Sequence, residues 1–254
     1  MCGRYASTRA RQELLDEFQI ELDASEDAVE PDYNVAPTKS VPAVIKRAPK
    51  GEEGESEEPV RMLRKVRWGL VPSWAKDPKI GNRLINARIE TAHEKPAFRR
   101  AFARRRCLLP ADGFYEWYEL KVPEGKPRKQ PFFIHPRDGG VMAMAGLYEL
   151  WRDPESDGEW VWTTTVITTA ATDEVGRIHD RMPMIVEQKS WEAWLDPGLT
   201  DPDEVRRLLE PAMAGRMEAY AVSTAVNNVR NNGPTLIEPL PDGDISGEYG
   251  ATLF

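Results

Sequence analysis

The stretch from residue 107 to residue 170 constrains the fold most, because it holds apolar segments of strand length one after another. Gly, Pro and charged residues separate these segments, as turns separate strands, and no helical pattern lies between them. The segments are CLLP, FYEWYEL, PFFIH, VMAMAGLYELW and WVWTTTVIT. Because parallel pairs need long crossover connections, strands in this order favour antiparallel pairing. We therefore predict a mainly antiparallel sheet.

Shorter elements are predicted on both sides of this stretch. Leu14, Leu15 and Phe18 have helical spacing behind Ser7 and Thr8, which are natural N-cap residues. Further helices are expected from about residue 95 to 105, in AATDEVGRIHD, in SWEAWL and in DPDEVRRLLEPAM, and further strands at 41–45, from residue 60, in MPMIV and in MEAYAVS. The pattern as a whole predicts an α+β fold, with a mainly antiparallel, barrel-like sheet and short flanking helices.

Two segments carry no regular pattern. Residues 48–59 (APKGEEGESEEP) are rich in Glu, Gly and Pro and predict a mobile acidic loop that joins two strands of a hairpin. Residues 235–254 are polar and Gly-rich and predict an irregular C-terminal tail. Neither segment separates two folded units, so we expect a single domain over residues 1–254, long enough to bury a substantial core.

The composition excludes several classes of protein. No apolar run approaches the roughly 18 residues that span a bilayer, and MCGRYASTRA lacks the apolar region of a secretory signal. Cys2 and Cys107 are too few for a disulfide framework, and neither CxxC nor HExxH occurs. We therefore expect a cytoplasmic monomer with no membrane contact, no metal and no cofactor.

The net charge of -8 hides an uneven distribution. Residues 61–106 hold 14 Lys and Arg against three acidic residues, which gives +11 and leaves -19 for the remainder of the chain. A basic band of this kind is expected at a binding site for a polyanion. It is equally expected on solvated helix faces, above all for the arginines of residues 99–106. The charge alone leaves both interpretations open.

Cys2 is the residue with the most specific chemistry, because it follows the initiator Met1 directly. Removal of Met1 would leave one residue with a thiol and an α-amine, whose ordinary pKa values are about 8.5 and 7.7 to 8.0. Such an aminothiol condenses with an aldehyde to an imine, which the thiol then closes to a thiazolidine. An N-terminal nucleophile hydrolase uses the same group differently. On position alone, an accidental cysteine at the second position is also expected.

Seven short motifs, in order along the chain, resemble the SRAP family, the SOS-response-associated peptidase proteins that crosslink to abasic sites in single-stranded DNA. These motifs are MCGRYA, YNVAPT, RWGLVPSW, LINARIET, CLLPADGFYEW, ITTAA and IHDRMP, and AVSTAVNNVRNNGPTLIEP extends the similarity almost to the C-terminus. The resemblance implies an SRAP-like fold and an abasic-site processing protein. Its partner would be single-stranded DNA with abasic sites, and it would associate with the nucleoid when bound to DNA.

The resemblance also implies a catalytic set. Cys2 matches the crosslinking residue, Asn86 in LINAR an active-site amide, Glu116 in FYEW the acid/base carboxylate and His179 in IHDRMP the active-site imidazole. If FYEWY is a strand, Glu116 shares a face with its aromatic neighbours two residues away, and a carboxylate in such a pocket has a raised pKa. Without the resemblance, a surface Glu, a loop His and a turn Asn are the simpler interpretations.

The resemblance further implies residues that contact DNA. Arg4, Arg88 and Arg181 each lie two residues beyond a member of the catalytic set, where a guanidinium can hold a phosphate. Asn34, Trp74 and Trp117 also match positions near the DNA, and Trp74 would stack on a base. Some relatives carry a second aromatic residue where this chain has Ala75. Read this way, the basic band lies along one groove for DNA and the remaining acidic residues form the exterior.

Three functions follow as hypotheses. The first is covalent capture of abasic sites by Cys2, with autoproteolytic removal of Met1. The second is an N-terminal nucleophile peptidase or amidase that acts mainly on its own Met1. The third is a noncovalent reader of single-stranded or modified DNA, for which Cys2 is incidental.

Overall fold

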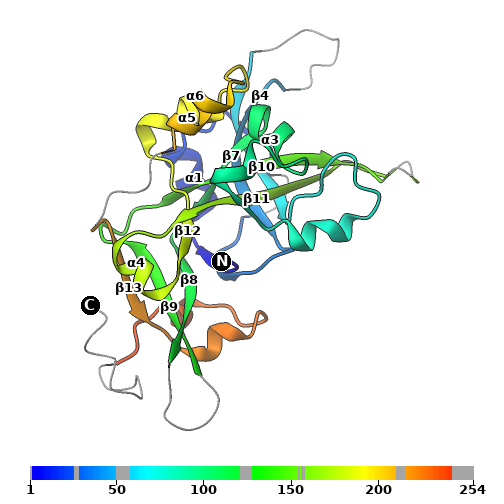
Figure 1. The fold of residues 1–254 in the computed structure, drawn as a ribbon. Helices are drawn as coiled ribbons and strands as arrows, with labels where there is room; N and C mark the ends of the chain where they lie inside the picture. The colour runs from blue at the N-terminus through cyan, green and yellow to red at the C-terminus, as the bar shows by residue number, and fades with distance from the viewer. Residues whose placement is uncertain are drawn as a thin grey trace.

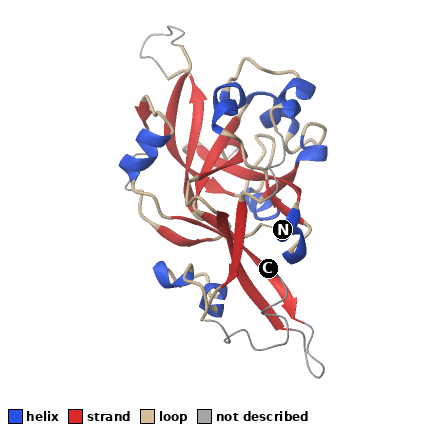
Figure 2. Cartoon of the chain, turned by 90° about the vertical axis from the view of Figure 1, so that its left-hand side faces the viewer, coloured by secondary structure: helices blue, strands red, loops and turns tan. Residues whose placement is uncertain are grey.

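Two mainly antiparallel sheets organise the computed structural model (Figure 1). The structure describes residues 2–25, 29–49, 58–120, 128–153, 155, 158–209 and 215–241. The five-stranded sheet has the order β13-β9-β8-β1-β3, and the eight-stranded sheet the order β12-β11-β10-β7-β4-β5-β2, with β6 paired to β11. Figure 2 shows these strands at the centre of the molecule and the short helices around them. The predicted α+β class with mainly antiparallel sheets is confirmed.

The strands are as follows. In the five-stranded sheet they are β1 (Tyr5–Ser7), β3 (Asp32–Val35), β8 (Gly113–Leu120), β9 (Arg128–Pro136) and β13 (Met217–Ala221). In the eight-stranded sheet they are β2 (Leu22–Asp23), β4 (Ser40–Arg47), β5 (Val60–Trp68), β6 (Asn86–Arg88), β7 (Arg106–Ala111), β10 (Met142–Trp151), β11 (Val161–Ala170) and β12 (Arg181–Pro183).

The helices are short. The α-helices are α1 (Arg11–Glu17), α2 (Ile89–Ala92), α3 (Arg99–Arg104), α4 (Asp173–Ile178), α5 (Trp191–Leu195) and α6 (Pro202–Arg207). The 3₁₀ turns are η1 (Pro78–Arg83), η2 (Gln188–Ser190), η3 (Thr224–Asn227) and η4 (Pro234–Leu236). Among the described residues, no helix combines the length and the apolar character needed to cross a membrane.

The larger sheet curls back on itself. Its strands β11, β10, β7, β4 and β5 pair in that order, and β11 then pairs with β5 in parallel, at Thr163 with Arg67 and Thr164 with Trp68. One hydrophobic cluster fills the concave side of this curl and includes Cys2, Trp68, Cys107 and Phe114. A second cluster packs the short helices on the outer side. The curl therefore encloses an apolar interior.

Most predicted elements are confirmed. All five segments between residues 107 and 170 are strands, and the strands predicted near residues 41 and 60 form the β4–β5 hairpin. The central part of the predicted acidic loop, residues 50–57, lies outside the described residues, and so does most of the predicted C-terminal tail, residues 242–254.

Two helix predictions were wrong in detail. The N-cap of α1 is Ala10 and not Ser7 or Thr8, because Thr8 donates its backbone N–H and its hydroxyl to Asp112 instead. The Glu13 carboxylate accepts a hydrogen bond from the Ala10 N–H and satisfies the end of the helix in its place. The helix predicted from residue 95 starts only at Arg99.

Gly113 permits the close approach of β8 to β9. An added Cβ there would lie 2.3 Å from a ring carbon of Phe133 and 2.7 Å from the Ile134 carbonyl oxygen. We expect Gly113→Ala to lower the free energy of unfolding by about 1–3 kcal/mol, because the backbone of β9 must move. Urea unfolding, with the midpoint compared at constant slope, measures the change. Gly176→Ala in α4, where the nearest contact is 3.6 Å, is the matched control and should leave stability unchanged or slightly raised. Equal midpoints for the two variants would contradict the close approach.

Candidate active site

Cys2 lies in the interior of the curled sheet, directly before β1. Its side chain is only 4% exposed and belongs to the cluster that contains Tyr5, Trp68 and Phe114. Burial raises the pKa of the Cys2 thiol well above its ordinary value, and the nearby Glu116 carboxylate, which accepts a hydrogen bond from the thiol, raises it further. The thiol is therefore neutral in the resting protein and donates its hydrogen to Glu116.

Glu116 faces the same interior from β8. Its side chain is buried, and across the ladder its residue pairs with Phe132. As the strand alternation predicted, Phe114 and Tyr118 pack on the cluster of Cys2, whereas Tyr115 and Trp117 pack on a separate cluster on the opposite face. Burial raises the pKa of Glu116, and the His179 imidazole and the Cys2 thiol oppose that rise. The predicted direction of the shift is confirmed.

His179 follows α4 and turns toward Glu116. Its Nε2 lies 3.9 Å from Oε2 of Glu116, a distance that allows a small movement or one intervening water to connect them. Its Nδ1 accepts a hydrogen bond of 3.0 Å from the Arg181 backbone N–H. Asp180 Oδ1 also lies 3.0 Å from Nδ1, but this carboxylate is 84% exposed and free to rotate, whereas the backbone N–H is fixed. Because Nδ1 accepts the hydrogen bond from Arg181, we assign a ring proton to Nε2, facing Glu116.

Asn86 fixes the position of Cys2. It lies on β6, paired with Val166 of β11, and its Nδ2 donates a hydrogen bond of 2.9 Å to the Cys2 carbonyl oxygen. Its Oδ1 is buried and has no hydrogen-bond partner among the described residues. A buried acceptor without a partner is costly, so this oxygen is suited to receive a donor from a bound molecule.

Four elements far apart in sequence thus converge on one point. The segment before β1 supplies the thiol, β8 the carboxylate, the end of α4 the imidazole and β6 the amide. A neutral thiol beside a carboxylate of raised pKa can transfer a proton without solvent, and the imidazole Nε2–H is placed to donate toward that carboxylate. The arrangement suits a nucleophile that is activated only when an electrophile is present.

Arg4, Asn34 and Trp117 form one packed group beside this site. Arg4 donates hydrogen bonds of 2.6 Å to Asn34 Oδ1 and 2.7 Å to the Val226 carbonyl, and its guanidinium lies 5.7 Å from the centroid of the Trp117 ring. The Trp117 indole N–H donates to Asn227 Oδ1 at 2.7 Å. The structure therefore places these three predicted residues together, but it also connects all of them to the segment around η3.

Asn34 is fully buried, and its amide is used within the protein. Its Nδ2 donates to the carbonyl oxygens of Val226, Asn228 and Asn231. A side chain with no exposed surface cannot contact DNA directly, so the interpretation of Asn34 as a direct contact does not fit this geometry. Its observed role is to hold the 226–231 segment and to orient Arg4.

Arg88 and Arg181 differ in how free their charges are. Arg88 is exposed at the end of β6. Arg181 makes two hydrogen bonds to Glu90, of 2.7 and 3.0 Å, and a third of 2.6 Å to the Thr168 carbonyl. The Arg181 contact holds the pKa of Glu90 below its ordinary value. Sequence reasoning missed Glu90, although its position two residues after Arg88 could have suggested a partner for one of the arginines.

Trp74 is presented to solvent by the loop that follows β5. Its side chain is 55% exposed, the largest exposed fraction among the large hydrophobic side chains of the described residues. Ala75, by contrast, is buried against Trp151, whose indole N–H donates to the Ala75 carbonyl at 2.7 Å. The loop is thus anchored one residue after Trp74, which leaves the Trp74 ring available for stacking.

The basic band of residues 61–106 does not form a single groove. Arg106 is 2% exposed, and its guanidinium donates to five carbonyl oxygens, including those of Trp194 and Phe102, so its charge stabilises the packing of α3 and α5. Arg105 forms an ion pair of 2.7 Å with Glu149. These two arginines therefore have partners within the protein, and neither is a free charge on a solvated helix face.

Fold and site together define an α+β protein that holds a cysteine next to its N-terminus against a buried carboxylate. The family model for SOS response associated peptidase (SRAP) matches residues 1–229, and the chain belongs to this family, as its motifs predicted. The abasic site processing protein YoqW of Bacillus subtilis is 42% identical over 238 residues, which cover 94% of this chain and 99% of that protein. The abasic site processing protein HMCES of Gallus gallus is 35% identical over 236 residues, 84% of this chain and 67% of that protein.

Solved structures share the fold. A crystal structure of a protein from Bacteroides thetaiotaomicron superposes with a TM-score of 0.79 at 24% sequence identity, over 94% of this chain and all of that one. A second, from Bordetella bronchiseptica, superposes with a TM-score of 0.65 at 26% identity, over 87% of this chain and 100% of that one. The arrangement of sheets described above is therefore an established fold.

The raised pKa of Glu116 gives a pH-dependent stability. Because the folded state keeps its proton to higher pH than the unfolded state, the contribution of Glu116 is fully present below the ordinary Glu value of 4.5 and is lost as pH rises through the folded-state pKa. We expect Glu116→Gln to be more stable than the wild type at neutral pH, because no buried charge remains. The gain should shrink toward about pH 4.

Urea unfolding at a series of pH values measures this difference. Glu119→Gln, an exposed position on the same strand, is the control and should show little change at any pH. A stability gain of Glu116→Gln that does not vary with pH would count against a raised pKa.

Proposed function

We propose that this protein processes abasic sites in single-stranded DNA by crosslinking Cys2 to the ring-opened aldehyde of the lesion. The observation that carries the proposal is the convergence of the Cys2 thiol, the buried Glu116 carboxylate and the His179 imidazole at one point. Relatives named abasic site processing proteins, similar over nearly the whole chain, support the substrate class. The crosslink itself is inferred from the chemistry of an N-terminal cysteine.

The proposed reaction balances without a cofactor. After Met1 is removed, the α-amine of Cys2 attacks the aldehyde carbon, and the adduct loses water to give an imine. The thiol sulfur then adds to the imine carbon while its proton passes to the nitrogen. One C–N bond and one C–S bond replace the C=O bond, one water leaves, and a thiazolidine joins protein and DNA. The five-membered ring forms quickly because both nucleophiles belong to one residue.

Glu116 and His179 are proposed to move the protons. The abasic sugar is mainly a closed hemiacetal, so a general acid/base must open it before an aldehyde exists. A carboxylate of raised pKa is suited to that step, and it also accepts the thiol proton in the second addition. His179, with Nε2–H directed at Glu116, is suited to donate the proton with which the hydroxyl of the first adduct leaves as water. Asn86 holds the Cys2 carbonyl, so that amine and thiol stay oriented.

The surrounding side chains are proposed to hold the strand. Arg88 is the exposed cation nearest in sequence to Asn86 and is suited to a phosphate. Arg4, fixed between Asn34 and Trp117, presents a positioned guanidinium. Trp74 is suited to stack on a base beside the lesion. For Arg181 we propose an indirect role, since its charge is already paired with Glu90.

Removal of Met1 is proposed to use the same groups. Attack of the Cys2 thiol on the Met1 carbonyl, followed by hydrolysis of the thioester, would release methionine and free the α-amine. This is the one reaction in which the chain would act as the peptidase of its family description. Turnover of peptides other than its own terminus would instead favour the N-terminal nucleophile peptidase.

The crosslink is tested with the two cysteines as a matched pair. We expect Cys2→Ala to abolish the shifted band on a denaturing gel after incubation with single-stranded DNA that carries one abasic site. Cys107→Ala should keep the band, because Cys107 is fully buried on β7 and burial raises the pKa of its thiol to about 12. A crosslink that persists in Cys2→Ala, or one that is absent from the wild type with Met1 removed, would overturn the proposal.

The role of Glu116 is tested by rate. We expect Glu116→Gln to slow crosslinking by about 10²- to 10⁴-fold, because a positioned acid/base contributes that much. Noncovalent binding of undamaged single strands should stay close to that of the wild type. Glu119→Gln, exposed on the same strand, should change neither quantity. Rates are read from the growth of the shifted band, and equal rates for the two variants would exclude the acid/base role.

A further inference from the structure

A large cavity lies at the end of the curled sheet away from Cys2. It has a volume of about 1010 Å³ and opens between β4, β5, β10, β11 and the end of α3. Trp162 of β11 lines it and points to the same face of the strand as Val166, the residue that pairs with Asn86. Four residues of strand separate Trp162 from Val166, a spacing of about 13 Å along an extended strand.

The lining of this cavity is strongly basic. Arg47, Arg64, Arg100, Arg104 and Arg105 line it, and Glu149 is the acidic residue among its described lining. Glu149 is paired with Arg105 at 2.7 Å. Arg100 and Arg104 project from α3 to solvent. Four arginines of the basic band therefore line this cavity together with Arg47, and none of the proposed catalytic residues is in its described lining.

Aromatic side chains hold the guanidinium groups in place. Arg64 lies 4.3 Å and Arg47 5.3 Å from the centroid of the Trp162 ring, and Tyr148 stacks on the same ring at 5.6 Å. Guanidinium groups that are held by cation–π contacts lose little freedom when they bind an anion. The cavity thus resembles a prepared site for phosphate groups rather than a solvated surface.

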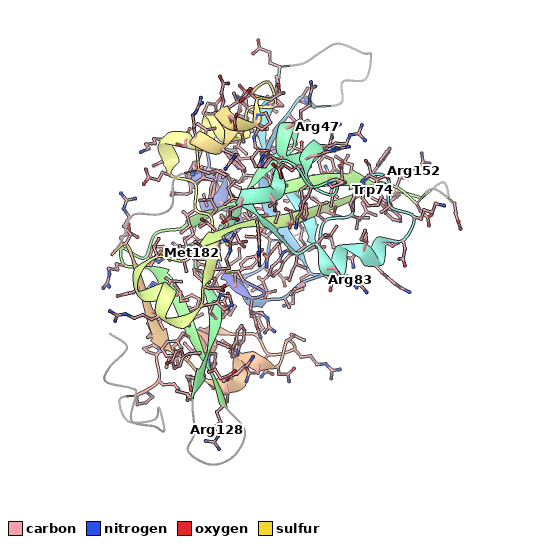
Figure 3. All side chains as sticks on the ribbon, viewed as in Figure 1. Arg47, Trp74, Arg83, Arg128, Arg152 and Met182 are labelled. Atoms are coloured by element: carbon pink, nitrogen blue, oxygen red, sulfur yellow. The ribbon has the colours of Figure 1, made fainter. Side chains whose placement is uncertain are left out.

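Two exposed tryptophans, Trp160 and Trp74, lie in or next to the lining of the cavity. Trp160 lines it and is 53% exposed. Ser73, the neighbour of the exposed Trp74, also lines it. Figure 3 shows Arg47 and Trp74 toward the same side of the molecule, with Arg128 at the opposite end from Arg47. Fixed cations together with exposed aromatic rings are the combination that binds single-stranded nucleic acid.

We propose that this cavity binds undamaged nucleotides of the DNA strand whose abasic site is captured at Cys2. Arg47, Arg100 and Arg104 contact phosphates, and Trp160 stacks on a base. The assignment rests on the proposed function, because it is the flank of the same strand that enters the cavity. Trp74 follows Ser73 of the cavity lining and is exposed, and it guides the strand from one site to the other.

The test compares long and short strands. At the duplex rise of 3.4 Å per nucleotide, a flank of about four nucleotides covers the roughly 13 Å along β11 between the two levels. We therefore expect wild-type affinity for a strand with about twelve nucleotides on each side to exceed that for a strand with about two. In the double variant Arg47→Gln/Arg100→Gln this gain should fall about tenfold or more, and the slope of affinity against salt should fall by about 2. Fluorescence anisotropy measures the affinities and the salt slopes, on strands of these lengths in which an undamaged nucleotide takes the place of the abasic site.

The control is Arg128→Gln/Lys129→Gln, which removes two exposed charges at the far end of β9 and should leave the gain unchanged. Trp160→Ala should lower affinity for the long strand about tenfold without a change of salt slope. The crosslinking rate with the short lesion strand shows that the variants are folded and should equal that of the wild type. An unchanged gain in Arg47→Gln/Arg100→Gln overturns the second site while the crosslink stands. Absence of any crosslink in the wild type overturns the proposed function instead.

Discussion

The burial of the Cys2 thiol against the Glu116 carboxylate is the constraint on which the rest of the site depends. Burial penalises a charge on either group, so the pKa of each is raised and the pair tends to hold its proton. A neutral thiol is a poor nucleophile, which protects it from adventitious reaction. The same low-dielectric surroundings strengthen the hydrogen bonds along which a proton would be transferred, once an electrophile replaces water. Burying this ionisable pair therefore costs stability and keeps the thiol neutral in the folded protein.

This arrangement requires an unusually well-fixed N-terminal segment. The first residues of a domain commonly fray, because few contacts hold them. Here β1 lies between β8 and β3 in the middle of a sheet, Asn86 holds the Cys2 carbonyl, and Arg4 is tied to Asn34 and Val226. These contacts come from elements distributed along the chain, so the site cannot form before the sheets have paired.

The sequence was sufficient for some of these features and insufficient for others. The alternation of FYEWY correctly separates the face of Glu116 from that of Tyr115, because strand period is a local property. The burial of Asn34, the pairing of Arg181 with Glu90 and the capture of Arg106 by carbonyl oxygens depend on partners far away in sequence. Residue type and motif position cannot reveal whether a polar side chain meets a ligand or another part of the protein.

The distribution of charge acquires a physical meaning once these partners are known. Several cations of the basic band are consumed within the protein, Arg106 by carbonyls and Arg105 by Glu149, so the sum of +11 overstates the charge available to DNA. Exposed cations of the band include Arg88, two residues after Asn86, and Arg100 and Arg104 on α3. At physiological salt the field of an exposed charge decays within about 8 Å. Each exposed cation therefore acts locally, so the net charge of the chain does not decide whether a polyanion can bind at one place on its surface.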